Sequence, residues 1–411
     1  MRWTLKPQPE KEKVEKLAKE LQVNSTIASI LCQRNIETFE DAKNYFRPNL
    51  EQIHDPFLMK DMDVAVSRIE TAIANNENIL IYGDYDVDGT TAVSLVSSYL
   101  KTIYSNIATY IPDRYAEGYG VSYKGIDFAH DNDFSLIIAL DCGIKAIEKV
   151  AYATKKNIDF IICDHHKPGP EIPKAIAVLN AKRNDCTYPF DELCGCGVGF
   201  KLIQALGVSR HKTIEDFLPY LDLVATAIAA DIVPMNGENR VLAYYGLDVI
   251  NQNPCNGIKA IIQQTKKTEL TITDVVFTIA PRINAAGRMK HGNYAVELLT
   301  EMDFDAAAEF AASIEIFNAD RKELDKKITD EAIIQIIDNE EEKGFSTVVY
   351  QEDWHKGVIG IVASRLIEKY YRPTLVFTKS GDMLAASARS VKGFDVYNAL
   401  QECEEFIEQF G

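Results

Sequence analysis

Short, continuously apolar segments alternate with helical patterns through the first half of this chain. The apolar segments lie at residues 78–82, 107–111, 136–140, 158–163 and 175–179. Helix-spaced stretches at 90–103 and 145–156 lie between them. Strands that are apolar on both faces belong in a parallel sheet whose two sides are covered by helices. The sequence therefore predicts an α/β domain built on a parallel sheet.

The remaining regions are predicted to flank this sheet. Residues 1–75 carry a helical pattern, and 76–302 hold the sheet and the mainly helical stretch after it. Residues 303–342 contain neither Gly nor Pro, and their apolar residues recur at helical steps, which predicts one long helix, or two in tandem, about 55 Å long if unbroken. Residues 343–411 form a smaller α/β unit, which we expect to be incomplete because no strand follows its last helix.

The smaller unit has a mixed pattern of its own. Its predicted strands are 347–350, 374–378 and 383–388, and its predicted helices are 358–370 and 396–407.

Composition restricts the class of protein. A net charge of −17 argues against a protein that coats nucleic acid nonspecifically, although it leaves room for a local basic groove. No apolar run approaches the roughly 20 residues that span a bilayer, and the charged N-terminal stretch lacks the apolar region of a signal peptide. We expect a cytoplasmic protein without a membrane segment. The eight cysteines lack zinc-type spacing, so reduced structural thiols fit them better.

The densest chemical motif is Gly83-Asp84-Tyr85-Asp86-Val87-Asp88-Gly89, directly after the first strand. Three carboxylates at alternate positions of an extended segment share one side, where they repel each other unless cations lie among them. Helix capping or a calcium-type loop is the structural alternative. An EF-hand is excluded because the distal Glu is missing and a strand precedes the motif.

More acidic residues and two histidines end elements that reach the same edge of the sheet. They are Asp141 after the strand 136–140, Asp164, His165 and His166 after the strand 158–163, and Asp231 after the apolar helical run 225–230. Open parallel sheets bind ligands at this edge. A single aspartate at this edge is more often a helix cap, but here four separate segments converge on one site, which favours a metal centre. Carboxylates with one or two imidazoles favour Mn²⁺ or Mg²⁺ and leave room for two ions about 3.5–4 Å apart.

Together these four segments resemble the DHH phosphoesterase superfamily, named for the Asp-His-His at 164–166. The first motif corresponds to residues 84–89, the second to Asp141 and the fourth to Asp231. Within the superfamily, the chain is similar to the RecJ-type family of bacterial single-strand-specific 5′→3′ DNA exonucleases from about residue 40 to the end. The supporting RecJ-like stretches are 111–120, 281–288 and 354–360.

The resemblance implies both an architecture and a reaction. It implies a parallel-sheet DHH domain (76–302) joined by a long helix (303–342) to a smaller α/β DHHA1-like domain (343–411). It also implies two divalent cations, Mn²⁺ or Mg²⁺, and hydrolysis of single-stranded DNA to 5′-mononucleotides in DNA repair and recombination. A helicase and a single-strand-binding protein are the implied partners, and a monomer is expected.

Roles for the metal-binding residues follow from the same resemblance. One ion is expected on Asp88, Asp141, His165 and Asp231. The other is expected on Asp86 and the bridging Asp141, with Asp84 close by. Some relatives have a histidine where this chain has Tyr82, which implies a weaker second metal or an additional water.

The implied catalytic residues are Asp84, Asp141 and His166. His166 is expected to contact the scissile phosphate or its metal. Asp164 is expected to orient a histidine, which is the usual role of such a carboxylate.

Cations and polar side chains in the RecJ-like stretches and in 383–390 are expected to hold the DNA. Those placed on phosphates are Arg114, Arg282, Arg288 and Arg389, with Asn284, Ser387 and Ser390 helping. Arginine suits bidentate phosphate capture, and a 5′-terminal phosphate is the natural anchor. Tyr115 and Tyr119 are expected to stack on bases. Surface ion pairs and core packing are the structural alternatives for these arginines and tyrosines.

The chain departs from the RecJ-type pattern at its C-terminal end. A glycine-rich segment with a histidine, and a nucleic-acid-binding barrel after it, are expected where the chain ends at Phe410-Gly411. We therefore expect an intact metal centre with a weaker grip on DNA. Two other functions stay open. One is a DHH-family phosphodiesterase for short oligonucleotides or cyclic dinucleotides, and the other is a non-catalytic replication scaffold, which the filled ligand positions disfavour.

Overall fold

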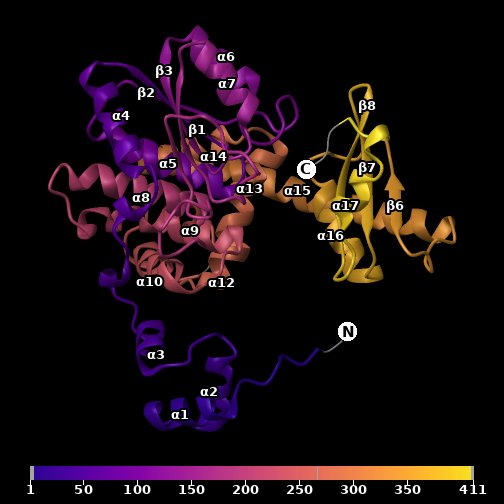
Figure 1. Ribbon diagram of the computed structural model, residues 1–411. Helices are drawn as coiled ribbons and strands as arrows, with labels where there is room; N and C mark the ends of the chain where they lie inside the picture. Colours follow the sequence, from indigo (N-terminus) through magenta and orange to yellow (C-terminus); the bar gives the residue numbers. More distant parts are fainter. Residues whose placement is uncertain (1–3, 266, 409–411) are drawn as a thin grey trace.

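A five-stranded sheet forms the centre of the largest body of the protein (Figure 1). The structure is a computed structural model that describes residues 4–265 and 267–408. The strands are β1 (Asn78–Gly83), β2 (Ile107–Tyr110), β3 (Phe134–Leu140), β4 (Asp159–Cys163) and β5 (Ala177–Leu179). They lie in the order β2-β1-β3-β4-β5, and each neighbouring pair is parallel. The predicted parallel-sheet α/β fold is confirmed.

Helices cover both faces of this sheet, because alternate strand residues point to opposite sides. Leu80 and Tyr82 of β1 pack with α6 and α7 in one core, whereas Ile79 and Ile81 face the larger core on the other side. The covering helices are α6 (Tyr123–Asp131) and α7 (Ile147–Lys155) on the first face, and α4 (Met62–Ala74), α5 (Val87–Lys101), α8 (Gly195–Val208) and α9 (Leu221–Asp231) on the second. Both faces of the sheet are therefore covered.

Further helices pack on those of the second face and extend the same apolar core. They are η3 (Ile214–Tyr220), α10 (Gly237–Gln252), α11 (Asn256–Gln263), α12 (Ile272–Asp274), the π-helix η4 (Val275–Ile279), α13 (Ala280–Met289) and α14 (Asn293–Thr300). No helix within residues 4–265 and 267–408 is both long enough and apolar enough to cross a bilayer.

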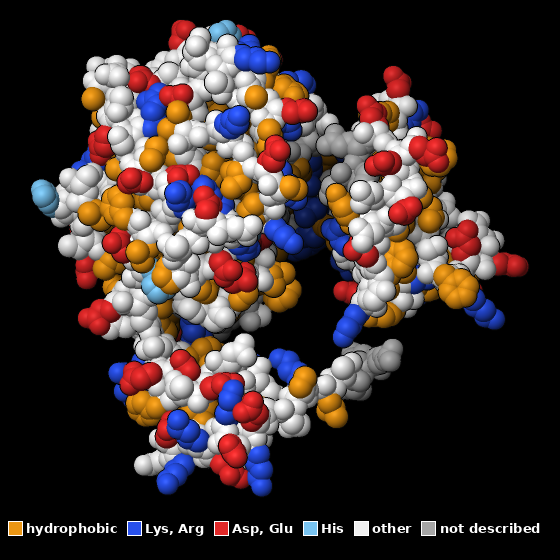
Figure 2. Space-filling model, in the orientation of Figure 1, with side chains coloured by type: hydrophobic (Ala, Val, Ile, Leu, Met, Phe, Trp, Pro, Cys, Tyr) orange, Lys and Arg blue, Asp and Glu red, His pale blue; other side chains and the backbone are white. Residues whose placement is uncertain are grey.

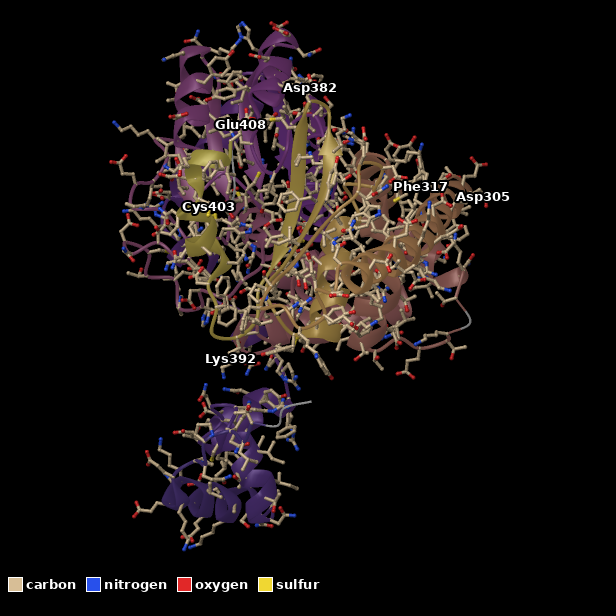
Figure 3. The ribbon with its side chains drawn as sticks, turned by 90° about the vertical axis from the view of Figure 1, so that its right-hand side faces the viewer. Asp305, Phe317, Asp382, Lys392, Cys403 and Glu408 are labelled. Carbon is tan, nitrogen blue, oxygen red and sulfur yellow. The ribbon has the colours of Figure 1, made fainter. Side chains whose placement is uncertain are left out.

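The N-terminal helices form a small body that stands apart from the rest in both ribbon views (Figures 1 and 3). These helices are α1 (Lys11–Leu21), α2 (Ser25–Cys32) and α3 (Phe39–Phe46), followed by the short turns η1 (Leu50–Gln52) and η2 (Pro56–Leu58). They enclose their own apolar cluster, which includes Leu17 and Leu31. Arg240 of α10 holds this body by stacking 3.8 Å from the centre of the Tyr45 ring.

One continuous helix, α15 (Phe304–Asp338), leads from the large body to the C-terminal one. Its 35 residues extend about 52 Å. The C-terminal body holds β6 (Thr347–Tyr350), α16 (Ile359–Tyr370), β7 (Thr374–Ser380), β8 (Met383–Arg389), α17 (Val396–Gln401) and η5 (Glu404–Phe406). The strand order is β6-β7-β8, with β6 parallel and β8 antiparallel to β7.

The last helix is shorter than the sequence pattern predicts. We expected it over 396–407, but α17 ends at Gln401 and only a short 3-10 turn follows. None of its residues is buried, and the acidic residues Glu402, Glu404 and Glu405 are unfavourable at the negative end of a helix. Figure 3 shows this segment, near Cys403, beside the β7–β8 hairpin whose turn carries Asp382.

Candidate metal centre

The carboxyl ends of three neighbouring strands deliver the acidic residues to one edge of the sheet. Gly83, Leu140 and Cys163 are register partners across β1, β3 and β4. The residues that follow them, Asp84 and Asp141 among them, therefore leave the sheet at the same level. Asp141 adopts a left-handed conformation with φ of 58° as its strand ends. The edge predicted from the sequence is the one at which these side chains meet.

The first motif is not the extended segment that we expected. Asp86 is the N-cap of α5, and its carboxylate accepts a hydrogen bond of 3.0 Å from the Gly89 amide. The chain therefore turns into a helix at Val87, and Asp88 lies in the first helical turn. Gly89 permits this, because a Cβ atom there would lie 2.4 Å from the Asp84 carbonyl oxygen. The expectation of alternating side chains was wrong, although Asp84 and Asp88 still reach the same centre.

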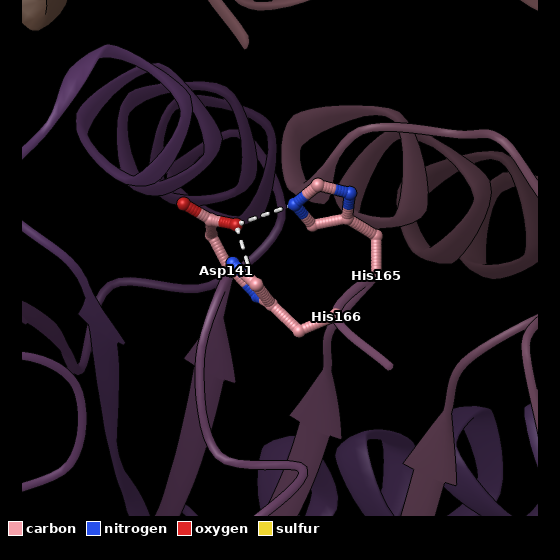
Figure 4. Close-up of side chains that lie close together, drawn as sticks. All are labelled: Asp141, His165 and His166. Atoms are coloured by element: carbon pink, nitrogen blue, oxygen red, sulfur yellow. Dashed lines mark ion pairs between the residues drawn. The ribbon is translucent and has the colours of Figure 1, made fainter. Parts of the chain in front are cut away.

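His165 lies close to three carboxylates, and Figure 4 shows the first of them, Asp141, paired with both His165 and His166. The Nε2 of His165 is 3.2 Å from Asp141 Oδ1, 3.6 Å from Asp231 Oδ2 and 3.7 Å from Asp88 Oδ2. Two groups of donor atoms result, each within 4.8 Å of one another: Asp141 with His165 and His166, and Asp88 with His165 and Asp231. His165 belongs to both groups. Asp84 and Asp86 lie near enough to raise the pKa of Asp141 by charge repulsion, but they belong to neither group.

Asp164 holds the second histidine. Its Oδ1 accepts hydrogen bonds from the His166 backbone amide at 3.0 Å and ring Nδ1 at 2.7 Å, and its Oδ2 accepts one from the Ile144 amide at 2.9 Å. Burial opposes ionisation of Asp164, but the bond from His166 lowers the pKa of this carboxyl below its usual range. The same bond raises the pKa of His166. Asp164 thus fixes the orientation of His166.

Like charges gathered in a buried space shift the pKa values of this centre. Burial, and then the charge of Asp86, raises the pKa of Asp84 to about 7. Burial, and then Asp231, raises the pKa of Asp88 to about 8, and the pKa of Asp141 is raised for the same kind of reason. Burial lowers the pKa of His165 to about 4, so this imidazole is neutral and one of its ring nitrogens has a lone pair that can bind a metal.

The donor set fits a divalent cation. Asp84 Oδ2, Asp141 Oδ1 and His165 Nε2 are buried and form no hydrogen bond within the described part of the chain. Such atoms carry a desolvation cost unless something satisfies them. A cation among them would satisfy these atoms and neutralise the repelling carboxylates. Carboxylate oxygens with one or two imidazoles suit Mn²⁺ or Mg²⁺.

Backbone amides that the sequence did not single out also hold the centre. Gly195 and Cys196, at the start of α8, donate hydrogen bonds of 2.6 and 2.7 Å to the two oxygens of Asp88. The Gly120 amide donates one of 3.2 Å to Asp84 Oδ1. Tyr82 secures the same loop, because its hydroxyl donates to the Gly120 carbonyl at 3.0 Å. In the sequence, the glycine-rich stretch at the start of α8 is the feature from which these contacts with Asp88 could have been predicted.

A group of arginines lies between the large body and the C-terminal body. Arg288 of α13 donates a hydrogen bond of 3.0 Å to the Gly357 carbonyl of the C-terminal body. Arg114 stacks 3.9 Å from the centre of the Tyr85 ring in the first motif, and Arg389 ends β8. Burial, followed by the charges of Arg114 and Arg321, lowers the pKa of Arg288 to about 10. Figure 2 shows Lys and Arg side chains on the walls of the hollow between the two bodies.

These arginines lack the carboxylate partners that usually neutralise buried cations. Among the described residues, Arg114 bonds the Gly287 carbonyl, and Arg389 bonds Ser364, Ser387 and the Ala388 carbonyl. Arg282 differs, because its Nε lies 2.6 Å from Glu315 Oε2 on α15. Arg114, Arg288 and Arg389 therefore form a wall that attracts anions, which we call the arginine wall. Arg282 is already paired with Glu315.

The other predicted DNA-contacting residues are distributed around this wall. The Tyr115 hydroxyl donates to the Arg288 carbonyl, and Tyr119, 52% exposed, places its hydroxyl 3.2 Å from His166 Nε2. Ser390 bonds the Phe394 carbonyl at 2.6 Å. Asn284 is half-buried in α13, two positions after Arg282. The Tyr115 ring also meets the His355 ring of the C-terminal body edge-on, with ring centres 6.0 Å apart, so Tyr115 contacts both bodies. Tyr119 faces the metal centre.

Comparison with known proteins places this arrangement in a family. The model of the DHH family, N-terminal domain, matches residues 78–228, and that of the DHHA1 domain matches 341–411. The chain is 38% identical over its whole length to the single-stranded-DNA-specific exonuclease RecJ of Bacillus subtilis, of which it spans 52%. It is 31% identical to RecJ of Dickeya dadantii over 91% of its own length and 67% of that protein. The chain belongs to the RecJ family.

A solved RecJ structure supports the same assignment. RecJ of Thermus thermophilus in complex with Mn²⁺ superposes with a TM-score of 0.86 at 26% identity, over 100% of this chain and 58% of the other. The predicted fold, a DHH domain followed by a smaller DHHA1 domain, is thereby confirmed. This RecJ-family chain spans about half the length of the Bacillus relative.

Proposed function

We propose that this chain hydrolyses single-stranded DNA from its 5′ end to mononucleotides, with two divalent cations, in DNA repair and recombination. One observation carries the proposal: buried, unsatisfied carboxylate and imidazole atoms lie near arginines that have no carboxylate partner among the described residues, and Arg114 is close enough to Asp84 to influence its charge. The first feature suits cations, and the second suits a phosphodiester chain. Their proximity supports phosphoryl chemistry on a nucleic acid.

The residues divide between two cations, Mn²⁺ or Mg²⁺. Asp88, Asp141, His165 and Asp231 would hold one, and Asp86 with the bridging Asp141 would hold the other, with Asp84 close by. The short distance from His165 to Asp141 and the unsatisfied Oδ2 of Asp84 support this division. When bound, such a pair supplies Lewis-acid stabilisation of developing charge on the phosphoryl oxygens and activates water as the nucleophile.

His166 would contact the scissile phosphate. Asp164 accepts a hydrogen bond from Nδ1, so Nε2 is the nitrogen that would face the reacting group. The raised pKa of His166 keeps the ring protonated to a higher pH, which makes it a cationic donor to a phosphate oxygen. Tyr119 holds the same ring from the opposite side.

The arginine wall would anchor the DNA strand. Arg114, Arg288 and Arg389 would bind the 5′-terminal phosphate and its neighbours, with Ser387 beside Arg389. The exposed ring of Tyr119 is available for base stacking. Arg282, Asn284, Ser390 and Tyr115 would contribute less directly, through the conformation of α13 and of the two loops.

The biological setting rests on the family alone. The RecJ relatives carry the name single-stranded-DNA-specific exonuclease, and this chain spans only part of them. We propose the same substrate for this chain. We also propose that its partners are a helicase and a single-strand-binding protein, and that it is a monomer in the cytoplasm. We also propose a DHH domain over 76–302, a connecting helix over 303–342 and a DHHA1 domain from 343.

Product release from matched substrates tests the proposal. The chain would be incubated with Mn²⁺ and a 5′-phosphorylated single strand, the same strand in a blunt duplex, or a cyclic dinucleotide. We expect mononucleotides from the single strand alone, and none in the presence of EDTA. Cleavage of only the cyclic dinucleotide would favour a small-substrate phosphodiesterase, and Mn²⁺ binding without cleavage of any substrate would favour a scaffold.

A further inference from the structure

The N-terminus of α8 supports one carboxylate of the candidate metal centre from behind. Asp88 is 2% exposed, and the Gly195 and Cys196 amides each donate to one of its oxygens. These are the first two amides of the helix, which no helical carbonyl can satisfy. The helix cap itself is Cys194, whose sulfur takes only the third amide, that of Gly197, at 3.4 Å. Asp88 therefore caps α8 from a different element.

The two amide contacts suit a carboxylate that binds a cation. Two charge-assisted hydrogen bonds and the positive end of a helix favour the ionised form. Each oxygen uses one lone pair on an amide, which leaves the other lone pair for a cation. The helix thus fixes the direction of the Asp88 carboxylate.

Gly195 has a second role that depends on its missing side chain. A Cβ atom on Gly195 would lie 2.5 Å from Asp141 Cβ and 2.6 Å from Asp141 Oδ1. Real Cβ atoms essentially never come so close, and Asp141 cannot simply withdraw because it follows β3 directly in a left-handed conformation. Any side chain at 195 must displace Asp141, the start of α8, or both.

We propose that Gly195 is a positioning residue of the metal centre. Its amide orients Asp88, and its lack of a side chain leaves the space that Asp141 occupies. One residue outside the ligand set thereby positions two ligands from different elements, Asp88 in α5 and Asp141 after β3. The inference rests on the proposed function to the extent that Asp88 and Asp141 bind metal.

Gly197 supplies a matched control on the same helix. A Cβ atom there would meet Leu193 at 3.4 Å and Cys194 Sγ at 3.6 Å, which are ordinary contacts. Alanine raises helix propensity similarly at both positions, by about 1 kcal/mol relative to glycine. A difference between Gly195→Ala and Gly197→Ala therefore reports the contact with Asp141 and Asp88 rather than the helix.

Calorimetric titration of the metal-free chain with Mn²⁺ tests the inference without recourse to activity. We expect Gly195→Ala to weaken binding by about 10- to 100-fold, as is typical when a supporting partner of a ligand is disturbed. Gly197→Ala should bind within about twofold of wild type, because its contacts are ordinary. Equal affinity in Gly195→Ala and wild type overturns the inference and leaves the proposed function standing. Absence of Mn²⁺ binding in wild type instead overturns the proposed function.

A folding control keeps the test decisive. Circular dichroism in EDTA shows whether Gly195→Ala still folds. If it does not, the double variant Gly195→Ala/Asp141→Gly removes the clashing side chain, and glycine tolerates the left-handed conformation at 141. Recovery of the folded state supports the contact with Asp141, and failure to recover overturns it.

Discussion

Tyr119 and His166 meet at 3.2 Å, between the tyrosine Oη and the histidine Nε2. The opposite ring nitrogen of His166 is bonded to Asp164 at 2.7 Å. The ring is therefore held from both sides, by a buried carboxylate and by an exposed phenol. Since Tyr119 belongs to the loop whose Gly120 amide bonds Asp84, this loop touches the candidate metal centre at two points.

Tyr119→Phe should slow the reaction with little effect on substrate binding. The variant keeps the ring for base stacking and loses only the hydroxyl that restrains His166. Loss of a hydrogen bond at this exposed position costs about 1 kcal/mol, which corresponds to a decrease in kcat of about fivefold. Steady-state release of mononucleotides from a 5′-phosphorylated strand would give kcat and KM separately.

Tyr123→Phe is the control for this substitution. Tyr123 is 45% exposed near the same loop and contacts the Tyr152 ring edge-on. Its kinetics should match wild type. A rise in KM without a change in kcat in Tyr119→Phe would mean that this hydroxyl serves DNA binding rather than His166.

Asp141→Ala should abolish turnover almost completely. Asp141 Oδ1 lies 3.2 Å from His165 and 4.0 Å from His166, and this oxygen is one of the buried unsatisfied atoms. Its loss would affect both proposed cations. Single-turnover assays with Mn²⁺ would measure the residual rate. A rate above about a tenth of wild type, a loss of less than about 1.4 kcal/mol, would contradict the shared-ligand scheme.

How much of the fold and of the site the sequence predicts depends on how far apart in the sequence the interacting residues lie. Parallel strands and the residues directly after them follow from local apolar runs, so the edge where Asp84 and Asp141 meet was predictable. The conformation of the first motif was not, because the Asp86 side chain caps the helix at Gly89 and ends the extended segment early. Capping competes with strand extension over a few residues, and three alternating aspartates fit both outcomes.

Long-range contacts account for most of what the sequence could not distinguish. Arg282 and Arg288 lie six positions apart in one helix and looked equivalent. The structure pairs Arg282 with Glu315 on α15 and directs Arg288 toward Gly357 of the other body. Only the packing of α13 against both neighbours separates these roles. The contribution of Gly195 likewise depends on a strand more than fifty residues away.

Arg389→Ala should weaken binding of the DNA 5′ end. Arg389 is exposed and bonds only serine hydroxyls and a carbonyl among the described residues, so its charge is available to a phosphate. For a 5′-phosphorylated single strand we expect Kd to rise and the slope of log Kd against log salt to fall by about 0.7. Fluorescence anisotropy at several salt concentrations in Ca²⁺ would measure both quantities.

Arg282→Ala is the comparison for Arg389→Ala. Because Arg282 is paired with Glu315, its loss should lower the melting temperature and leave the salt slope unchanged. If Arg282→Ala reduced the slope and Arg389→Ala did not, the proposed division between anchoring and structural arginines would be reversed.

The metal-free protein should lose stability as pH rises between about 6.5 and 8. In the folded state the pKa values of Asp84 and Asp88 are raised to about 7 and about 8. A raised folded pKa gives stability that is complete below the unfolded value, near 4, and is lost as pH rises through the folded value. The depressed pKa of His165 acts in the opposite direction, but only between about 4 and 6.5. Above pH 6.5, the carboxylates determine whether stability rises or falls with pH.

Mn²⁺ should reverse this dependence, because the ligands must be deprotonated to bind it. We expect the increase in melting temperature on addition of Mn²⁺ to be larger at pH 8 than at pH 6.5. Urea unfolding in EDTA across this range would give the metal-free slope, and Asp84→Asn should flatten it near pH 7, where Asp84 titrates. A metal-free stability that rises from pH 6.5 to 8 would show that these carboxylates are not held close together without metal.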